Sequence, residues 1–179
     1  ITPDLATYGK AMAHGLPVGA VGGRADVMAC FSGGDMSKWV FSGGTFNGNP
    51  LTSVAGIAAL TEMRDTQDTL YPYINLQGDR LAAAVNSFCE AEGFAAHLYN
   101  AGSMVHLRFE GHPVEGSFDF SKDGRFAERE FYLHLLGYGV FIPGVHLAFL
   151  CGAHSEKDVA TIIEAFKQSF RDLREDGLL

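Results

Sequence analysis

The feature that most constrains the fold is a helix that is apolar on almost all of its faces. Asn49 followed by Pro50 is typical of a helix start, because asparagine caps the free amides and proline needs no partner at the first helical position. The residues that follow leave no polar stripe: Leu51, Val54, Ala55, Ile57, Ala58, Leu60 and Met63. A helix that is hydrophobic all round is covered by protein on all sides. We therefore expect residues 51–63 to be buried.

Composition places the chain among globular proteins without a basic surface. Of its 179 residues, 47% are hydrophobic and 19% are charged, which excludes disorder as the dominant state. The formal net charge is −8 and the basic residues are scattered, so we expect no nucleic acid and no membrane as partner. Cys30, Cys89 and Cys151 contain no CxxC pair, and the histidines show no metal-ligand spacing. We expect a soluble, cytoplasmic protein with reduced thiols and no metal centre.

A change in composition divides the chain into two parts. Ten of the 22 glycines precede Pro50, which indicates a loop-rich region ahead of the apolar helix. A polar, turn-rich link is expected from Asp65 to Pro72, and a helix with one apolar side follows it and stops at Gly93. The predicted domains are residues 1–72 and residues 73–179.

The second part mixes strands and helices. Val105, Leu107 and Phe109 alternate with polar residues, which is the period of a half-buried strand. Further elements are expected over residues 123–136 (helix), 140–142 (strand), 147–150 (strand) and from Ser155 (final helix). Ser155 and Asp158 resemble a capping box, and the final helix has one apolar stripe: Val159, Ile162, Phe166, Phe170 and Leu173. The fold class is therefore α/β or α+β.

One lysine stands where an amine can act as a nucleophile. Lys10 follows Gly9 at the end of a short extended segment, and a glycine- and proline-rich stretch comes next. An amine held among apolar and small residues loses hydration, which frees the lone pair that attacks a carbonyl carbon. A single Gly-Lys pair has little specificity, so an ordinary surface lysine is the competing interpretation.

A second candidate is the glycine-rich turn over residues 41–50, which carries the hydroxyl group of Thr45. Because the turn stands just before a helix start, it offers free amide donors, the helix dipole and this hydroxyl to an anion such as phosphate. It is not a P-loop, since no GK[ST] closes it. An ordinary capped turn is the competing interpretation.

Five motifs follow one another in the first fifty residues: Pro3-Asp4-Leu5, Gly9-Lys10, Gly15 to Gly23, Arg24 to Met28, and Gly44 to Pro50. Their order resembles that of the class III pyridoxal-phosphate aminotransferases of fold type I, and most closely the glutamate-1-semialdehyde aminomutase-like branch. Weaker likeness continues through Gly102-Ser103-Met104 and Ala153-His154-Ser155. The resemblance covers essentially the whole chain.

The resemblance implies an α/β fold in which this chain is the carboxyl half. The first part is similar to the C-terminal part of the large domain of a fold type I transferase that binds pyridoxal phosphate (PLP). The second part is similar to the small α+β C-terminal domain of that fold. The family places half of its active site upstream of the lysine, so we expect a missing N-terminal portion and a whole chain roughly twice this length.

The resemblance also implies roles for individual residues. Lys10 is similar to the lysine that forms an aldimine with pyridoxal phosphate and then moves a proton between substrate and cofactor. Gly44 and Thr45 look like the residues that reach the cofactor phosphate of the neighbouring subunit, so a homodimer with shared active sites is implied. Residues 142–149 contain none of the acids or arginines that the family places there. His146 is left as a candidate substrate contact, and a histidine without function is the alternative.

The implied function is that of an aminotransferase or aminomutase, which moves an amino group between small-molecule donors and acceptors. A racemase, an epimerase or a decarboxylase on the same fold stays open as an alternative, because the residues that select the reacting bond are largely absent from this sequence. A second alternative is a dimerisation module without catalysis. The presence of both Lys10 and Thr45 disfavours that alternative.

Overall fold

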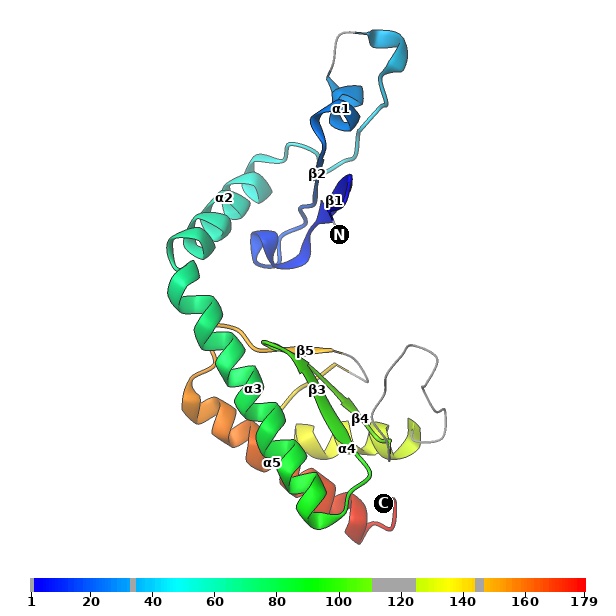
Figure 1. Ribbon diagram of the computed structural model, residues 1–179, viewed down its shortest axis with the longest axis vertical. Helices are drawn as coiled ribbons and strands as arrows, with labels where there is room; N and C mark the ends of the chain where they lie inside the picture. Colours follow the sequence, from blue (N-terminus) through cyan, green and yellow to red (C-terminus); the bar gives the residue numbers. More distant parts are fainter. Residues whose placement is uncertain (1, 33–34, 111–124, 144–146) are drawn as a thin grey trace. The chain divides into compact units, whose positions relative to one another are not determined.

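The structure is a computed structural model that describes residues 2–32, 35–110, 125–143 and 147–179. The chain forms two compact units, Ile1–Asp68 (unit 1) and Thr69–Leu179 (unit 2). In Figure 1, where colours follow the sequence, unit 1 begins in blue and unit 2 ends in red. The predicted boundary, after residue 72, falls close to this division. The assignment of the two units to separate domains stays a prediction.

Unit 1 combines a hairpin with helices. Strand β1 (Leu5–Tyr8) pairs antiparallel with β2 (Ala20–Gly23), with Leu5 opposite Gly23 and Tyr8 opposite Ala20. The helices are η1 (Lys10–Ala13), α1 (Ala25–Met28), η2 (Ala29–Phe31), η3 (Met36–Lys38) and α2 (Pro50–Asp65). The short helix η1 packs against α2, as Figure 1 shows for the blue and cyan parts of the chain.

Helix α2 begins where the sequence predicts. The Asn49 Oδ1 atom accepts hydrogen bonds from the amides of Leu51 at 3.0 Å and Thr52 at 3.2 Å. Proline occupies the first helical position, where no hydrogen bond is lost. The local start signal is therefore confirmed.

The prediction that α2 is buried on all sides is wrong for this chain. Only its small side is buried, and it consists of Thr52, Gly56 and Ala59. This side meets η1, whose Ala13 is 1% exposed. Because η1 covers only one side of the helix, the large apolar side chains of α2 stay exposed: Leu51, Val54, Ile57 and Leu60.

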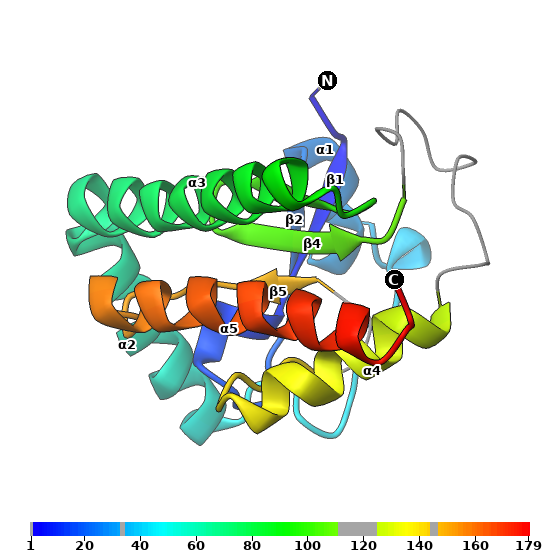
Figure 2. The same cartoon turned by 90° about the horizontal axis from the view of Figure 1, so that it is seen from below.

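Unit 2 packs helices around a three-stranded antiparallel sheet. Its elements are α3 (Gln67–Glu92), β3 (His97–Ala101), β4 (Met104–Arg108), α4 (Arg125–Gly137), β5 (Ala148–Phe149) and α5 (Glu156–Glu175). The strand order is β3-β4-β5, with Leu98 opposite Leu107 and Val105 opposite Ala148. Helix α5 lies beside α4 (Figure 2). The mixed fold class is confirmed.

One apolar core joins the elements of unit 2. Its buried side chains include Leu81, Val85, Leu98, Val105, Leu107, Phe131, Leu135, Val159, Phe166, Phe170 and Leu173. Phe170 is fully buried, and its ring centroid lies 4.7 Å from that of Phe131 and 5.1 Å from that of Phe94. The predicted stripe of the final helix is therefore the side that faces this core.

Two predicted helix boundaries in unit 2 are confirmed. At the end of α3, Gly93 has a φ of 74°, and the amide of Phe94 donates to the Cys89 carbonyl at 2.8 Å. This is the glycine-terminated end that the sequence predicts. At the start of α5, the Asp158 amide donates to Ser155 Oγ at 3.2 Å, and the Ser155 amide donates to Asp158 Oδ2 at 2.8 Å. The capping box is therefore present.

The predicted polar link from Asp65 to Pro72 is largely wrong. Helix α3 begins at Gln67 and includes Pro72, so only Thr66 separates it from α2. Pro72 is in the second turn of α3, where a proline keeps a helical φ but loses the hydrogen bond of its missing N–H and crowds the carbonyl four residues earlier. The helix continues through it in spite of this cost. Polar residues around a proline therefore do not distinguish a link from the first turns of a helix.

The strands were predicted less well than the helices. Residues 140–142 form no strand, because the Val140 amide donates to the Leu135 carbonyl at 2.9 Å and closes the end of α4. The strand expected over 147–150 is reduced to β5. Strand β4 lies where its alternation predicts, but its partner β3 was not predicted.

The helix α3 touches the turn between β3 and β4 at Gly78. A Cβ atom at this position would overlap the carbonyl oxygen of Gly102. The turn is also tied to α3 by Asn75, whose Oδ1 accepts a hydrogen bond from the Ser103 amide at 3.0 Å. A larger residue at position 78 therefore requires helix and turn to move apart.

Gly78→Ala is expected to lower the free energy of unfolding by about 1–3 kcal/mol, the usual cost of overpacking. Gly137→Ala is the matched control, since Gly137 is also helical and a Cβ there has no atom within 4 Å. The control should be neutral or stabilising by up to about 1 kcal/mol. Urea unfolding measures both, and equal stabilities would contradict the close approach of α3 to the turn.

Candidate active site

Lys10 stands at the junction between β1 and η1. Its φ of 55° lies in the left-handed region, which a residue with a side chain rarely adopts. Such strain is often found at functional sites. Lys38 and Lys167 pair with carboxylates, whereas no ion pair among the described residues involves Lys10. Lys10 is exposed, so the expected loss of hydration around its amine is wrong for this chain. The exposed amine is available to a carbonyl group.

Contacts on both sides hold the backbone of Lys10. Arg24 closes the open end of the β1–β2 hairpin, since its guanidinium donates to Asp4 Oδ1 at 2.7 Å and to Asp26 Oδ2 at 2.6 Å. The hydrogen bond from Arg24 lowers the pKa of the Asp26 carboxyl. Beyond Lys10, η1 is anchored on α2 through Ala13. Hairpin and helix together fix the place from which the amine projects.

Gly44 and Thr45 lie in the turn that leads into α2, and both are exposed. The Asn47 amide donates to the Gly44 carbonyl at 2.9 Å, which closes the turn. The prediction of free amides at the helix start is wrong for Leu51 and Thr52, because Asn49 accepts their hydrogen bonds. An asparagine cap takes the same donors that an anion would use. The exposed hydroxyl of Thr45 remains as a donor for an anion.

The predicted site residues are only partly placed by the structure. Lys10 and Thr45 both belong to unit 1, but they come from separate elements, and no described hydrogen bond joins them. His146 lies outside the described residues. The roles of these residues therefore stay predictions.

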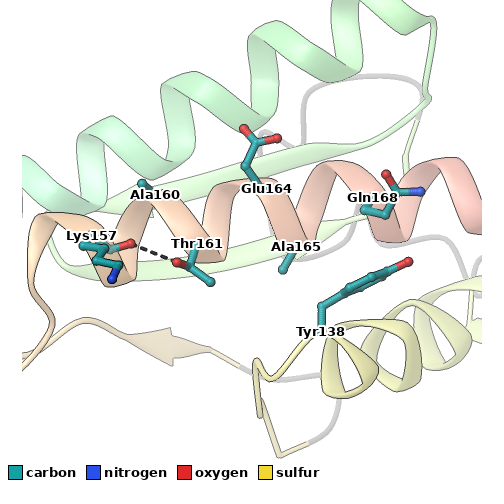
Figure 3. Close-up of a pocket in the computed structure, with 7 residues that line it drawn as sticks. All are labelled: Tyr138, Lys157, Ala160, Thr161, Glu164, Ala165 and Gln168. Carbon is teal, nitrogen blue, oxygen red and sulfur yellow. Dashed lines mark hydrogen bonds between the residues drawn. The ribbon is translucent and has the colours of Figure 1, made fainter.

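A shallow groove of about 510 Å³ lies between the end of α4 and α5 (Figure 3). It is lined by Tyr138, Lys157, Ala160, Thr161, Glu164, Ala165 and Gln168. The Tyr138 hydroxyl donates to Asp172 Oδ2 at 2.7 Å, which raises the pKa of Tyr138. The Thr161 hydroxyl donates to the Lys157 carbonyl at 3.0 Å. Both hydroxyl groups are used in hydrogen bonds to α5, and neither Lys10, Gly44 nor Thr45 lines this groove.

One pair of reactive side chains was not predicted. The Cys151 Sγ atom lies 3.3 Å from His154 Nδ1 in unit 2. The only sequence signal is a spacing of three residues, which is too common to predict a contact. Within the described ranges, no group of three or more His, Cys, Asp or Glu side chains is arranged to hold a metal ion. None of the helices there combines the length and apolarity that a bilayer crossing requires.

Comparison with known proteins identifies the family. The sequence profile described as Aminotransferase class-III matches residues 1–168. The chain belongs to the class-III aminotransferase family. The family and the fold type that the motif order indicates are therefore confirmed.

Relatives that match nearly all of this chain are much longer than the chain itself. It is 33% identical over 177 residues to the "Glutamate-1-semialdehyde 2,1-aminomutase 2" of Bacillus pumilus (strain SAFR-032), which covers 97% of this chain and 40% of the relative. A β-phenylalanine aminotransferase from Variovorax paradoxus superposes with a TM-score of 0.84 at 29% identity, covering 96% of this chain and 39% of that structure. An omega-transaminase from Sphaerobacter thermophilus gives 0.80 at 29% identity, covering 97% and 40%. The chain thus spans about 40% of the length of these relatives.

Proposed function

We propose that the protein containing this chain is a PLP-dependent enzyme that moves an amino group, with Lys10 as its catalytic lysine. The observation that carries the proposal is the exposed Lys10 amine on a strained backbone, inside a family match that extends over residues 1–168. The relatives are named aminomutase, aminotransferase and transaminase, and all three names describe the movement of amino groups.

The described residues fit pyridoxal phosphate. Its aldehyde needs a primary amine that no carboxylate holds, and Lys10 provides one. Its phosphate needs hydroxyl or amide donors, and the exposed turn at Gly44 and Thr45 offers a hydroxyl. When bound, this cofactor withdraws electrons from the substrate carbon that carries the amine.

The protein supplies binding, orientation and proton movement. The Lys10 Nζ atom binds the cofactor aldehyde, and the same atom carries the proton that moves during the reaction. The hairpin and the η1–α2 contact orient this atom. In the proposed homodimer, the Thr45 hydroxyl donates to the cofactor phosphate of the neighbouring subunit.

We propose that the reaction is amino transfer between two small molecules. The enzyme is proposed to be a cytoplasmic homodimer with shared active sites. Movement of the amino group within one molecule, as the name aminomutase describes, is the alternative inside the family. Incubation with an amino donor and a 2-oxo acid separates the two. Transfer produces a new amino acid in proportion to the donor consumed, whereas movement within one molecule does not need the acceptor.

Cofactor binding at Lys10 can be tested directly. The whole protein with pyridoxal phosphate should show an absorption band near the visible edge that borohydride removes. Peptide mass spectrometry should then find the reduced cofactor on Lys10. Lys38→Ala is the control, since Lys38 is an exposed lysine of the same unit and pairs with Asp35. The proposal fails if the band is absent or if the label is on another lysine.

Thr45→Ala is expected to weaken cofactor binding by about 1–3 kcal/mol, the value of a hydrogen bond to a charged acceptor. Thr45→Ser retains the hydroxyl and should bind nearly as tightly as the natural protein. Equilibrium titration of the cofactor-free protein measures both affinities. An unchanged affinity in Thr45→Ala would remove Thr45 from the site.

Mixed dimers test whether the sites are shared. One chain carries Lys10→Ala and the other carries Thr45→Ala. If each site takes its lysine from one chain and its threonine from the other, both defects fall in one site and the second site is intact. Half of the activity then survives with normal cofactor affinity. If the sites are not shared, the surviving site binds the cofactor weakly.

A further inference from the structure

A thiol and an imidazole meet on a turn that the proposed function does not use. Cys151 is exposed, and its Sγ atom lies 3.3 Å from Nδ1 of His154. The backbone amide of Cys151 donates to the same nitrogen at 3.1 Å. Since an N–H group donates to it, Nδ1 is the unprotonated ring nitrogen, and the amide and the thiol of Cys151 share its one lone pair. The thiol therefore has a base within reach, as an activated nucleophile requires.

The turn holds this pair in place. The His154 amide donates to the Cys151 carbonyl at 3.0 Å, and the Tyr73 hydroxyl of α3 donates to the His154 carbonyl at 2.8 Å. A Cβ at Gly152 would lie 2.8 Å from Leu70 Cδ1, so the turn packs directly on α3. The capping box at Ser155 follows at once. Thiol and base are thus oriented before any reagent arrives.

An apolar cavity of about 550 Å³ adjoins the base. His154 contributes to its lining, and it is the one lining residue in the described part of the chain with a polar side chain. The other lining residues are apolar and include Leu81, Phe141, Phe149 and Phe166. Cavities of this size and polarity accept small apolar molecules. A reagent that reaches Cys151 therefore finds apolar surface beside the imidazole.

We propose that Cys151 is a site of covalent modification by α,β-unsaturated carbonyl compounds that carry an apolar group, with His154 as the base. The Cys151 sulfur forms a bond to the β-carbon, and the thiol proton passes to His154 Nδ1, which gives up its hydrogen bond from the Cys151 amide while it holds the proton. The electron pair of the carbon–carbon double bond moves onto the α-carbon and its carbonyl group, which form an enolate. The α-carbon then takes the proton from Nδ1. The step is an addition, so it needs no leaving group and no oxidant.

The two other cysteines of the chain serve as internal references. Cys89 is buried in the core of unit 2, and burial raises the pKa of its thiol to about 12. It should therefore stay unmodified while the protein is folded. Cys30 is half-buried in η2 of unit 1, and no imidazole is among its described hydrogen-bond partners. A faster reaction at Cys151 than at Cys30 would reflect the exposure of Cys151 and the imidazole beside its thiol.

N-ethylmaleimide is the probe, used on the whole protein near neutral pH and quenched with a small thiol at timed intervals. Peptide mass spectrometry gives the rate for each cysteine. Cys151 should react at least about tenfold faster than Cys30, in keeping with the usual gain from a positioned base. The key variant is His154→Asn, because the asparagine Oδ1 can accept the Cys151 amide in place of Nδ1 but is not a base.

In His154→Asn the rate at Cys151 should fall about tenfold or more and recover as the pH is raised, because hydroxide then removes the thiol proton. Thermal melting checks that the variant is folded. An unchanged rate in a folded His154→Asn protein, or faster labelling of Cys30, overturns the proposal. The rate at Cys151 divided by the rate with glutathione should be higher for N-phenylmaleimide than for N-methylmaleimide. Equal ratios for the two reagents overturn the preference for an apolar group.

Discussion

Replacing Lys10 with alanine is expected to abolish turnover while the protein stays folded. The Lys10 Nζ atom is proposed both to bind the cofactor and to carry the proton, and proton transfer by a positioned group is worth on the order of 10²–10⁴-fold. A loss of at least about 10³-fold is therefore expected. The side chain is exposed, so its removal opens no cavity in the core. Turnover with an amino donor and a 2-oxo acid measures the loss, and thermal melting measures the fold.

Two further variants make this result specific. Lys10→Arg keeps the positive charge but lacks the primary amine, so it should be as inactive as Lys10→Ala. Lys38→Ala removes a lysine whose Nζ is 3.6 Å from Asp35 on the surface, and such pairs contribute little to stability. It should keep nearly full activity. Near-normal turnover in Lys10→Ala would show that another residue is the catalytic lysine.

Phe170→Ala is expected to be the most destabilising substitution in unit 2, with a loss of about 3–5 kcal/mol in the free energy of unfolding. The Phe170 ring is fully buried and contacts four other rings, at centroid distances of 4.7 to 6.4 Å. Those rings come from different elements, so the cavity cannot close by moving one helix. Since whole domains are stable by about 5–15 kcal/mol, urea unfolding will detect the change easily.

Phe126→Ala is the matched control for the core. Phe126 lies in α4 and is 64% exposed, so its removal uncovers little buried surface. Its loss should change the free energy of unfolding by no more than about 0.5 kcal/mol, as for most surface substitutions. Equal losses in the two variants would contradict the aromatic core, because the ring at position 170 would then be no more buried than the ring at position 126.

The features that the sequence predicted correctly depend on neighbours in the chain. The start of α2 at Asn49, the end of α3 at Gly93 and the capping box at Ser155 are each made by residues within a few positions. The alternation in β4 and the stripe of α5 report which side faces the core, but not what covers it. Local hydrogen bonds and periodicity are sufficient for these predictions.

The features that were missed depend on contacts between distant residues. Residues 140–142 have the composition of a strand, yet the Val140 amide is used to close α4. Helix α2 has the composition of a buried helix, yet in this chain only its small side is covered. Strand β3 was missed because its residues take their strand conformation from pairing with β4. Composition fixes what a segment can become, and its partners decide which possibility is realised.

The candidate site likewise combines features that the sequence alone determined with features that only the folded structure creates. The order of motifs around Lys10 and Thr45 is a property of the covalent chain, so the sequence alone determined the family and the candidate lysine. The left-handed backbone of Lys10 and its anchoring through η1 on α2 exist only in the folded unit. The Cys151–His154 pair is held by Tyr73, which is 81 positions before His154. Such contacts arise when packing brings distant segments together, and no local pattern records them.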